Sequence, residues 1–568
     1  MANDIVVNWL DNHIPDYKNK KMKNIPFNNE NITRAHMYMS KYTPLQNTTN
    51  NDPIFVFTQF YISSNKARNN ELKKVLELMV INKNIEKIYL LNERIYRDDE
   101  LGIQSDKIQQ MVINNRLTYK ICYDKVEELN LNGYIILTNS DIFFDKSITN
   151  IKKTNFHKER AIFTLLRHEF NVYNNLSNCK LFGPRHDSQD TWIFHSNFNI
   201  PSRYRNAFDF ILGIPGCDNK VIYLYNILGY ECYNNPTLIK CYHYQLSSYR
   251  NYKKNKLRLP YMYVIPSFGD HNYNKYNFAY ENETFYNWLN EKLNNNKSFI
   301  VPRLAGVENN MAHLGYLYTS NKSNVKENKI LPNIPVMKNN AGIFLKGFNS
   351  FAQYSKLYLE AFELCELFFY WPEWSSVSQY SRESYTFIYN KYKKQLLSSD
   401  VLNIFNHIHN NPWTLALRKK RLLIISCFVE SIKLKLENRD KIYGIDLFPE
   451  CEFIFLKPPQ THGKNDSRDF QLELEEFCKE IEKIKDSFDV ALCSCGGYGN
   501  LVCSSIYKMN KSAIYVGGVL QMYFGIYGQR WIDENPDVLT LYKNTHWTRP
   551  NQEEKPNGFT QIENNCYW

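Results

Sequence analysis

The stretch Tyr134–Asp145, YIILTNSDIFFD, decides how the rest of the chain is interpreted. It begins with an apolar run typical of a buried strand in a parallel sheet and continues into Asn139, Ser140 and Asp141. Open α/β sheets bind ligands at the carboxyl ends of their strands. A carboxylate in that position suits a divalent cation that bridges phosphate oxygens. Taken alone, the pattern is also that of a strand ending in an aspartate-stabilised turn, so the flanking sequence has to decide.

On both sides of this stretch, apolar runs of strand length alternate with segments of helical spacing. Such alternation predicts a mainly parallel sheet with helices on its faces. Strands are expected at residues 54–62, 85–91, 116–123, 160–166, 191–194, 230–233 and 238–244, and helices at 5–10, 69–80, 220–228 and 277–296.

The alternation resumes in the second half of the chain, after an Asn-rich segment at residues 294–297. Strands are expected at 298–301, 422–427, 452–456, 489–493 and 512–516, and helices at 351–369, 429–439, 470–485 and 500–508. A loop is expected at 320–337, and an irregular tail after Trp531. We therefore predict an α/β protein with two Rossmann-like units, the first with a mixed sheet and the second with a parallel sheet and helices on both faces. The predicted domains are a leader or peripheral cap at 1–50, a first domain at 51–294 and a second at 295–568.

Composition narrows the functional classes. A chain of 568 residues is too long for one core. The net charge of +11 is spread along the sequence, whereas a nucleic-acid site needs a clustered stripe, so no nucleic-acid partner is expected. No apolar run approaches the ~20 residues of a membrane span, and the N-terminus lacks the pattern of a signal peptide. Thirteen cysteines without C-x-x-C pairs favour reduced thiols and a cytoplasmic location, or the host cytoplasm or virion for a viral chain.

Asp141 has a plausible partner in His243, which ends a later predicted strand. An aspartate, a histidine, two phosphate oxygens and water would form an octahedral Mn²⁺ or Mg²⁺ site. A histidine in this position is more often one that simply ends a strand. Asp190 and Asp218 each follow a turn and are candidate general bases, although each is also a candidate turn or helix cap. Together with polar residues at the ends of the first two strands, they predict a cleft.

The order of the motifs resembles the GT-A glycosyltransferases, in particular a group from bacteria and large DNA viruses whose central motif is N-S/A-D-I-x-F-D. The resemblance covers about residues 52–260 and depends on TQFY, NSDIFFD, SQDTWIF, GIPGCDN and a late histidine strand. It implies that Asp141 and His243 bind the metal, and that Asp218 or Asp190 deprotonates the acceptor if the reaction inverts. The first acid of the family's D-x-D motif is replaced by Asn139. The residues then expected around the nucleotide sugar are Thr58, Gln59, Tyr61, Asn92, Glu93, Asn139, Ser140 and Arg167.

The second unit contains SCGGYG at Ser494–Gly499, between a predicted strand and helix. Glycines there let backbone N–H groups approach a phosphate, although a tight turn explains them equally well. By resemblance this unit is similar to GT-D-type glycosyltransferases, whose early R-F-G-D-G-E-like motif corresponds to Arg303–Glu308 here. The motif's aspartate falls on Gly306 and its glutamate on Glu308. The expected ligand contacts in this unit are Glu308, Gly496, Gly497 and Gly499.

Three hypotheses follow. The first is a metal-dependent transferase that moves a sugar from a nucleoside-diphosphate donor, with a UDP-sugar expected, to a hydroxyl of a glycan acceptor, with both units active. The second keeps one active GT-A-like domain and makes the C-terminal unit a non-catalytic module for acceptor binding or scaffolding. The third places a Rossmann oxidoreductase or methyltransferase in the C-terminal half, and would be favoured if that half bound NAD or S-adenosylmethionine.

Overall fold

The computed structural model describes two compact units, which divide between Asn277 and Phe278. The described residues are 35–113, 115–170, 176–183, 185–247, 256–258, 260–268, 278–320, 330–371, 382–461, 467–555 and 568. The helix expected at residues 5–10 and most of the leader lie outside them.

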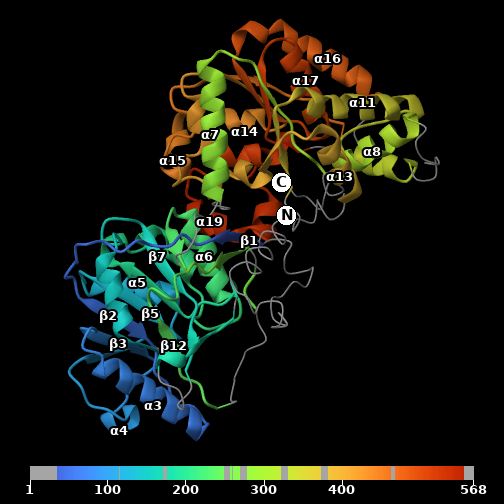
Figure 1. The fold of residues 1–568 in the computed structure, drawn as a ribbon. Coiled ribbons are helices and arrows are strands. Elements are labelled where there is room, and N and C mark those ends of the chain that lie inside the picture. The colour runs from blue at the N-terminus through green and yellow to red at the C-terminus, as the bar shows by residue number, and fades with distance from the viewer. Residues whose placement is uncertain are drawn as a thin grey trace. The chain divides into compact units, whose positions relative to one another are not determined.

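A seven-stranded mixed sheet forms the centre of the first unit (Figure 1), in the order β11-β7-β10-β5-β2-β3-β4. β2, β3, β4 and β5 are parallel, and β10 is antiparallel to both of its neighbours, β5 and β7. Every residue of β2 and β5 is buried, as the apolar runs predict. The strands are β2 Ile54–Thr58, β3 Lys87–Asn92, β4 Ile108–Val112, β5 Tyr134–Thr138, β7 Ala161–Leu165, β10 Thr191–His195 and β11 Glu231–Tyr233.

Side chains of alternate residues on these strands pack against different helices. Ile193 of β10 belongs to the cluster that contains Leu72 of α3, whereas the ring of the adjacent Trp192 contacts Tyr119 of α5 edge to face. This alternation follows from the two-residue repeat of a strand and buries both faces of the sheet. The helices of the unit are α3 Lys66–Ile81, α4 Asp98–Leu101, α5 Tyr119–Glu128 and α6 Cys217–Ile227.

A second, smaller sheet lies beside the first and carries much of the site. Its order is β6-β12-β8-β9, with strands of only two or three residues: β6 Ile142–Phe144, β12 Cys241–His243, β8 His168–Glu169 and β9 Lys180–Leu181. In its register, His243 pairs with Ile142 on one side and with Glu169 on the other. A two-stranded parallel pair, β1 Ala35–Met39 and β13 Tyr261–Ile265, completes the unit.

Two predictions for this unit are wrong. The strand expected at residues 116–123 is helix α5, capped by the Thr118 hydroxyl, which accepts from the N–H of Ile121. Its buried residues include Tyr119, Cys122, Tyr123 and Val126, which follow a helical spacing that the alternating apolar residues at the start of the segment concealed. The edge strand β4 was missed because its residues are only partly buried and show no apolar pattern.

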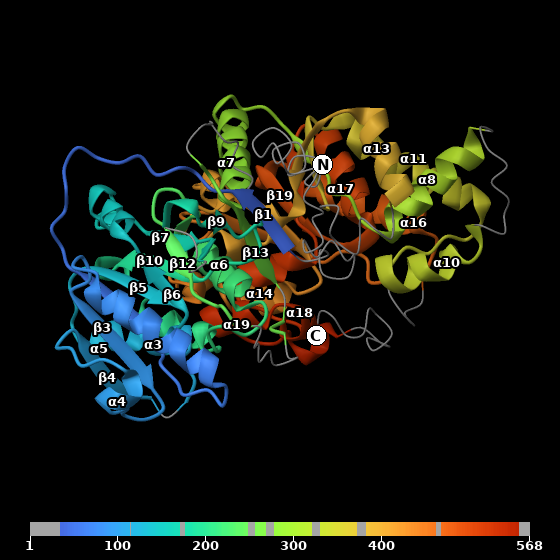
Figure 2. The same cartoon turned by 60° about the horizontal axis from the view of Figure 1, so that its bottom comes forward.

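A five-stranded, all-parallel sheet organises the second unit, in the order β14-β20-β19-β17-β18. Helices α8, α11, α13, α16 and α17 contribute to one hydrophobic cluster with residues of these strands; α8 and α11 lie side by side (Figure 2). The strands are β14 Ile300–Val301, β17 Arg421–Ser426, β18 Glu452–Leu456, β19 Val490–Ser494 and β20 Ser512–Tyr515, and β15 Leu367–Tyr370 pairs separately with β16 Gln395–Ser398. The main helices are α7 Phe278–Asn294, α8 Val307–Thr319, α11 Phe348–Leu364, α13 Arg382–Tyr392, α16 Phe470–Lys483 and α17 Gly499–Lys508.

The division between the units lies one helix before the boundary predicted at 294/295. Helix α7, expected to close the first domain, packs within the second unit through Phe285, whose ring contacts those of Phe369 and Trp413. The amide of Asn282 also donates to the carbonyls of Asn410 and Asn411. The polar composition of the helix concealed this aromatic face.

Shorter helices occur where the sequence indicated loops or longer helices. The tail expected to be irregular forms α18 Gln529–Glu534 and α19 Pro536–Tyr542, the loop at 320–337 contains α10 Asn333–Val336, and the helix expected at 429–439 is divided into α14 Val429–Lys433 and α15 Arg439–Tyr443. None of the described helices combines the length and apolarity needed to cross a bilayer.

Candidate active site

A cavity of about 1020 Å³ opens in the first unit where β2, β5 and the small sheet end. Thr58 and Asn92 are buried in their strands and are not among its described lining residues. The predicted site residues that do line the cavity are Gln59, Tyr61, Glu93, Asn139, Ser140, Asp141, Arg167, Asp190, Asp218 and His243.

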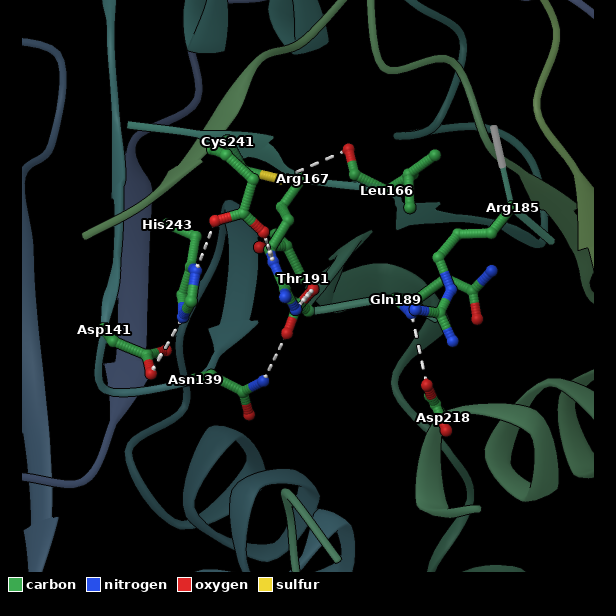
Figure 3. A network of polar contacts seen from close by, with 12 residues as sticks. Asn139, Asp141, Leu166, Arg167, Arg185, Gln189, Thr191, Asp218, Cys241 and His243 are labelled. Carbon is green, nitrogen blue, oxygen red and sulfur yellow. Dashed lines mark hydrogen bonds and ion pairs between the residues drawn. The ribbon is translucent and has the colours of Figure 1, made fainter. Parts of the chain in front are cut away.

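Asp141 and His243 lie side by side on one wall of this cavity (Figure 3). The His243 Nε2 atom is 3.3 Å from Asp141 Oδ2, and the Nδ1 atom is 3.0 Å from Glu169 Oε2. Adjacent ligands of an octahedral cation with bonds of roughly 2.1 Å are about 3.0 Å apart, so this pair fits one Mg²⁺ or Mn²⁺ ion. A carboxylate on the far nitrogen is the usual way to orient a metal-binding histidine. Within the described residues, no group of three or more His, Cys, Asp or Glu side chains forms a complete cage, so substrate oxygens and water would have to fill the other positions.

Charged neighbours stabilise the ionised forms of this pair. Burial disfavours the Asp141 carboxylate, but His243 and Arg68 outweigh it and hold its pKa well below the usual range. Burial likewise opposes protonation of His243, yet Asp141 and Glu169 raise its pKa to about 9. The pKa of Glu169 falls to about 2 despite burial, because His243 and Arg167 are close. In the cation-free protein the imidazole is therefore protonated between two carboxylates.

Two residues of this network were not predicted. Arg68, from the first turn of α3, places its guanidinium 2.6 Å from Asp141 Oδ2, and Glu169 was passed over as a residue following Arg167. One indication of Arg68 was present in the sequence: the predicted helix begins at the next residue, Asn69, which places Arg68 at the N-terminus of a helix. Nothing in the sequence indicates the pairing of Glu169 with His243, because the register of the small sheet creates it.

Asp190 is held on both of its carboxylate oxygens. Asn139 donates its amide to Oδ1 at 2.8 Å, and Arg167 donates to Oδ2 at 2.9 Å. Arg167 also bonds Glu169 at 2.8 Å, so the interactions continue without a break to His243. Asp190 thus connects the two sheets, and we assign it an anchoring role in preference to that of a base.

Asp218 lies in a different environment, in the first turn of α6 (Figure 3). Its Oδ2 accepts from the Gln189 N–H at 3.3 Å, and no salt bridge to a cation is seen among the described residues. Burial, together with the nearby charges of Asp187 and Asp190, raises the pKa of Asp218 to about 7. A carboxyl with this pKa, in a cavity beside a cation site, has the properties of a general base.

Asn139 occupies the position where the D-x-D motif of the GT-A enzymes that the sequence resembles has its first acid, and this arrangement gives its side chain a role. Its side-chain amide is the donor that Asp190 accepts. An aspartate here would place two carboxylates at hydrogen-bonding distance, where both cannot stay ionised. The substitution therefore removes one potential metal ligand and supports the Asp190–Arg167 interaction.

Gln59 and Glu93 shape the opposite part of the cavity. The Gln59 side chain accepts from the N–H of Leu117 at 3.0 Å and donates to the carbonyl of Asn115 at 3.1 Å. It thereby fixes the segment that presents Arg116 to the cavity. Glu93 accepts from the hydroxyl of Tyr96 and also lines the cavity.

The glycines of the second unit are explained by packing. A Cβ added to Gly497 would lie 2.5 Å from the Ile343 side chain, and one added to Gly499 would lie 2.3 Å from the ring of Tyr515. Packing thus accounts for the absence of a side chain at Gly497 and Gly499, and Gly496 has a φ of +52°, in the left-handed region that glycine favours. Glu308 lies in the first turn of α8, close enough to Tyr354 and Tyr358 to help raise their pKa values, which burial raises most.

No protein-family model and no curated protein matches this sequence. Similar solved structures include the domain of unknown function 1792, described as having a distinct glycosyltransferase fold: 14% identity, 50% of this chain and 94% of that chain covered, TM-score 0.27. They also include the mannosyltransferase PcManGT from Pyrobaculum calidifontis, in complex with GDP-Man and Mn²⁺ (8% identity, 36% and 62% covered, TM-score 0.24). A third is a cytidylyltransferase from Leptospira borgpetersenii (14% identity, 26% and 60% covered, TM-score 0.17). With such low scores, the functional argument depends on the residues of the site.

Replacing Asn139 by aspartate should destabilise the first unit in a pH-dependent way. The new carboxylate would face Asp190, and we expect the free energy of unfolding to fall by about 1–3 kcal/mol at pH 8. The loss should be smaller at pH 5, because the pair can then share a proton. Denaturant unfolding of Asn139→Asp and Asn139→Ala at both pH values checks this. An equal loss for Asn139→Asp at the two pH values would contradict the charge argument.

Replacing Gly499 by alanine should destabilise the second unit by about 1–3 kcal/mol, because the methyl group would overlap the Tyr515 ring. Gly347 is the control: nothing lies within 4 Å of a Cβ there and its backbone is extended, so Gly347→Ala should cost only alanine's poorer fit to the helix N-cap, about 0.5–1 kcal/mol. Thermal unfolding of the two variants compares them. If Gly499→Ala instead left stability unchanged, the glycine would need an explanation other than packing.

Proposed function

We propose that the first unit is a metal-dependent glycosyltransferase that moves a sugar from a nucleoside-diphosphate donor, with UDP expected, to a hydroxyl of a glycan acceptor. One observation carries the proposal. A single cavity contains the Asp141–His243 pair, with its imidazole oriented by Glu169, and a separate carboxyl, Asp218, with a pKa near 7. A cation site for a diphosphate and an independent base are the two elements that sugar transfer with inversion requires.

Different residues of the cavity carry out different parts of the proposed reaction. Asp141 and His243 would hold a Mn²⁺ or Mg²⁺ ion, which when bound offsets the charge that develops on the leaving diphosphate. Arg167, which is expected near the nucleotide sugar, is already paired with Asp190 and Glu169, and its contribution is to keep the wall of the cavity in place. Asp218 accepts the proton of the acceptor hydroxyl as that oxygen attacks the anomeric carbon. Holding donor and acceptor in one cavity lowers the entropic cost of their encounter.

For the second unit we favour the non-catalytic role, acceptor binding or scaffolding. The specific observation is that packing against Ile343 and Tyr515 accounts for Gly497 and Gly499, so these glycines need no donor phosphate to explain them. The guanidinium of Arg303 lies 4.7 Å from the centre of the Tyr515 ring and donates to the Val516 carbonyl.

A hydrolysis screen with UDP-, GDP- and dTDP-sugars, with and without Mn²⁺, tests the proposed function. We expect turnover of a subset of donors that requires Mn²⁺, and its complete loss in Asp141→Ala, because the cation ligand is gone. Glu308→Ala should retain full activity if the second unit is non-catalytic. Asp99→Ala, at an exposed carboxylate outside the cavity, is the control. Residual activity in Asp141→Ala that Glu308→Ala removes would instead show two active units.

The pH dependence of Asp218 gives a second test. We expect transfer to rise with pH to a plateau with an apparent pKa of about 7, and Asp218→Asn to lose about 10²–10⁴-fold in kcat, since only the carboxylate accepts the proton. A pH–rate profile of both proteins measures this.

The same substitution should stabilise the protein. The pKa of Asp218 is raised on folding from 3.8, so the folded state binds its proton more tightly, and the free energy of unfolding falls as pH rises from about 4 to 7. Asparagine removes that loss, so Asp218→Asn should be more stable than the wild type at pH 8, by on the order of 2 kcal/mol, but not at pH 4. A variant that is inactive and also less stable at pH 8 would show that Asp218 is a structural residue.

A further inference from the structure

Arg68 is the cation closest to the proposed metal ligands. One of its terminal nitrogens lies 2.6 Å from Asp141 Oδ2, the other is 3.1 Å from Glu71 Oε2, and Nε is 3.4 Å from the Tyr61 hydroxyl. The Arg68 side chain is only 9% exposed and that of Asp141 16%, so water screens this contact weakly. Arg68 also lines the cavity.

Asp141 Oδ2 is therefore shared, since Arg68 contacts the same oxygen that faces His243 Nε2. A divalent ion bound between Asp141 and His243 would lie within a few ångströms of the guanidinium. Like charges at that separation repel appreciably, and more strongly when partly buried. With the guanidinium already 2.6 Å away, the charge of the Asp141 carboxylate is compensated before any metal enters.

The guanidinium is not free to rotate away from an incoming ion. Glu71 is 4% exposed, and its carboxylate accepts from the N–H groups of Leu246 at 2.7 Å and Ser247 at 2.5 Å as well as from Arg68. These two residues lie three and four positions after His243, the last residue of β12. Glu71 thus holds Arg68 against Asp141 and ties both to the segment after β12.

We propose that Arg68 makes cation binding conditional on the diphosphate, so that the site takes up a divalent cation and a nucleoside diphosphate together and binds the bare cation weakly. The diphosphate carries enough negative charge to serve both the ion and the guanidinium, which the carboxylate of Asp141 alone does not. This inference rests on the proposed function, because it assumes the cation site of Asp141 and His243. It adds that Arg68 is a positioning residue that sets the order of binding.

The test measures binding without turnover. Mn²⁺ binding to the full chain is followed by electron paramagnetic resonance of the free ion, first alone and then with UDP or GDP, with correction for Mn²⁺ held by the nucleotide in solution. The variants are Arg68→Met, which removes the charge, and Arg68→Lys, which keeps the charge but loses the two-pronged contact. Arg205→Met is the matched control: Arg205 is equally buried (5% exposed) in an ion pair with Asp124 and does not line the cavity.

We expect opposite changes in the two affinities of Arg68→Met. Bare Mn²⁺ should bind about tenfold tighter, because the repulsion is removed, while the nucleotide in the presence of Mn²⁺ should bind at least tenfold more weakly, because a cationic contact is lost. The factor by which each ligand strengthens the other should fall, and by linkage it must fall equally for both. Arg68→Lys should keep the weak binding of bare Mn²⁺, and Arg205→Met should match the wild type.

The proposed role of Arg68 and the proposed function would fail in different ways. If the wild type binds bare Mn²⁺ as tightly as it does with nucleotide, or if Arg68→Met leaves bare Mn²⁺ binding unchanged or weakens it, the role of Arg68 is wrong and the cation site stands. If the wild type binds Mn²⁺ under neither condition, the proposed function itself fails. Circular dichroism melting separates misfolding from either result, and should Arg68→Met not fold, Arg68→Gln, which also removes the charge but keeps a donor near Asp141, is measured in its place with the same expected changes.

Discussion

The first unit's cavity depends on one interaction, the His243 imidazole held between two carboxylates. Asp141 lies on its Nε2 side and Glu169 on its Nδ1 side, and each acid has an arginine of its own, Arg68 and Arg167. Because positive and negative groups alternate, every member is ionised with a partner, although the site is largely shielded from water. The donor atoms are consequently fixed before a ligand arrives, which is the condition under which electrostatic stabilisation costs no reorganisation.

Backbone topology creates that interaction from residues far apart in sequence. β5 ends at Thr138 and β6 begins at Ile142, so the chain leaves the main sheet and enters the small one within three residues, with Asp141 at the junction. The strands β12 and β8 then bring His243 and Glu169 into register beside it. The small strands are too short to be stable alone, so their pairing must draw on burial of residues such as Phe143 and Tyr242, whose rings stack.

Sequence reasoning identified the parts that local pattern encodes. The apolar runs predicted β2, β5 and β19, and a carboxylate after a buried strand indicated Asp141. It did not find Glu169, because pairing across a sheet register leaves no trace in local sequence. It did not find the contact of Arg68 with Asp141, because that contact joins a helix to a strand end 73 positions away. Sequence reasoning also placed helix α7 in the first unit, because the helix contacts aromatic side chains more than a hundred positions away, such as Trp413. The glycines at 496–499 show the converse. Phosphate binding and a tight turn explain them equally well in the sequence, and only the positions of Ile343 and Tyr515 favour packing in a turn.

The two candidate bases show how environment divides residues that look alike in sequence. Asp190 and Asp218 both follow turns, yet Asp190 forms an ion pair with Arg167 and accepts from the amide of Asn139, whereas Asp218 has Asp187 and Asp190 as its charged neighbours. Two acids that lie in different electrostatic environments can have different roles, one as an anchor and the other as a base. Asn139 contributes to this difference between Asp190 and Asp218. An aspartate there would add a negative charge to the cluster, weaken the hold on Asp190 and move proton release from Asp218 to higher pH. For the base proposed above, Asn139 in place of an aspartate therefore favours proton release nearer neutral pH.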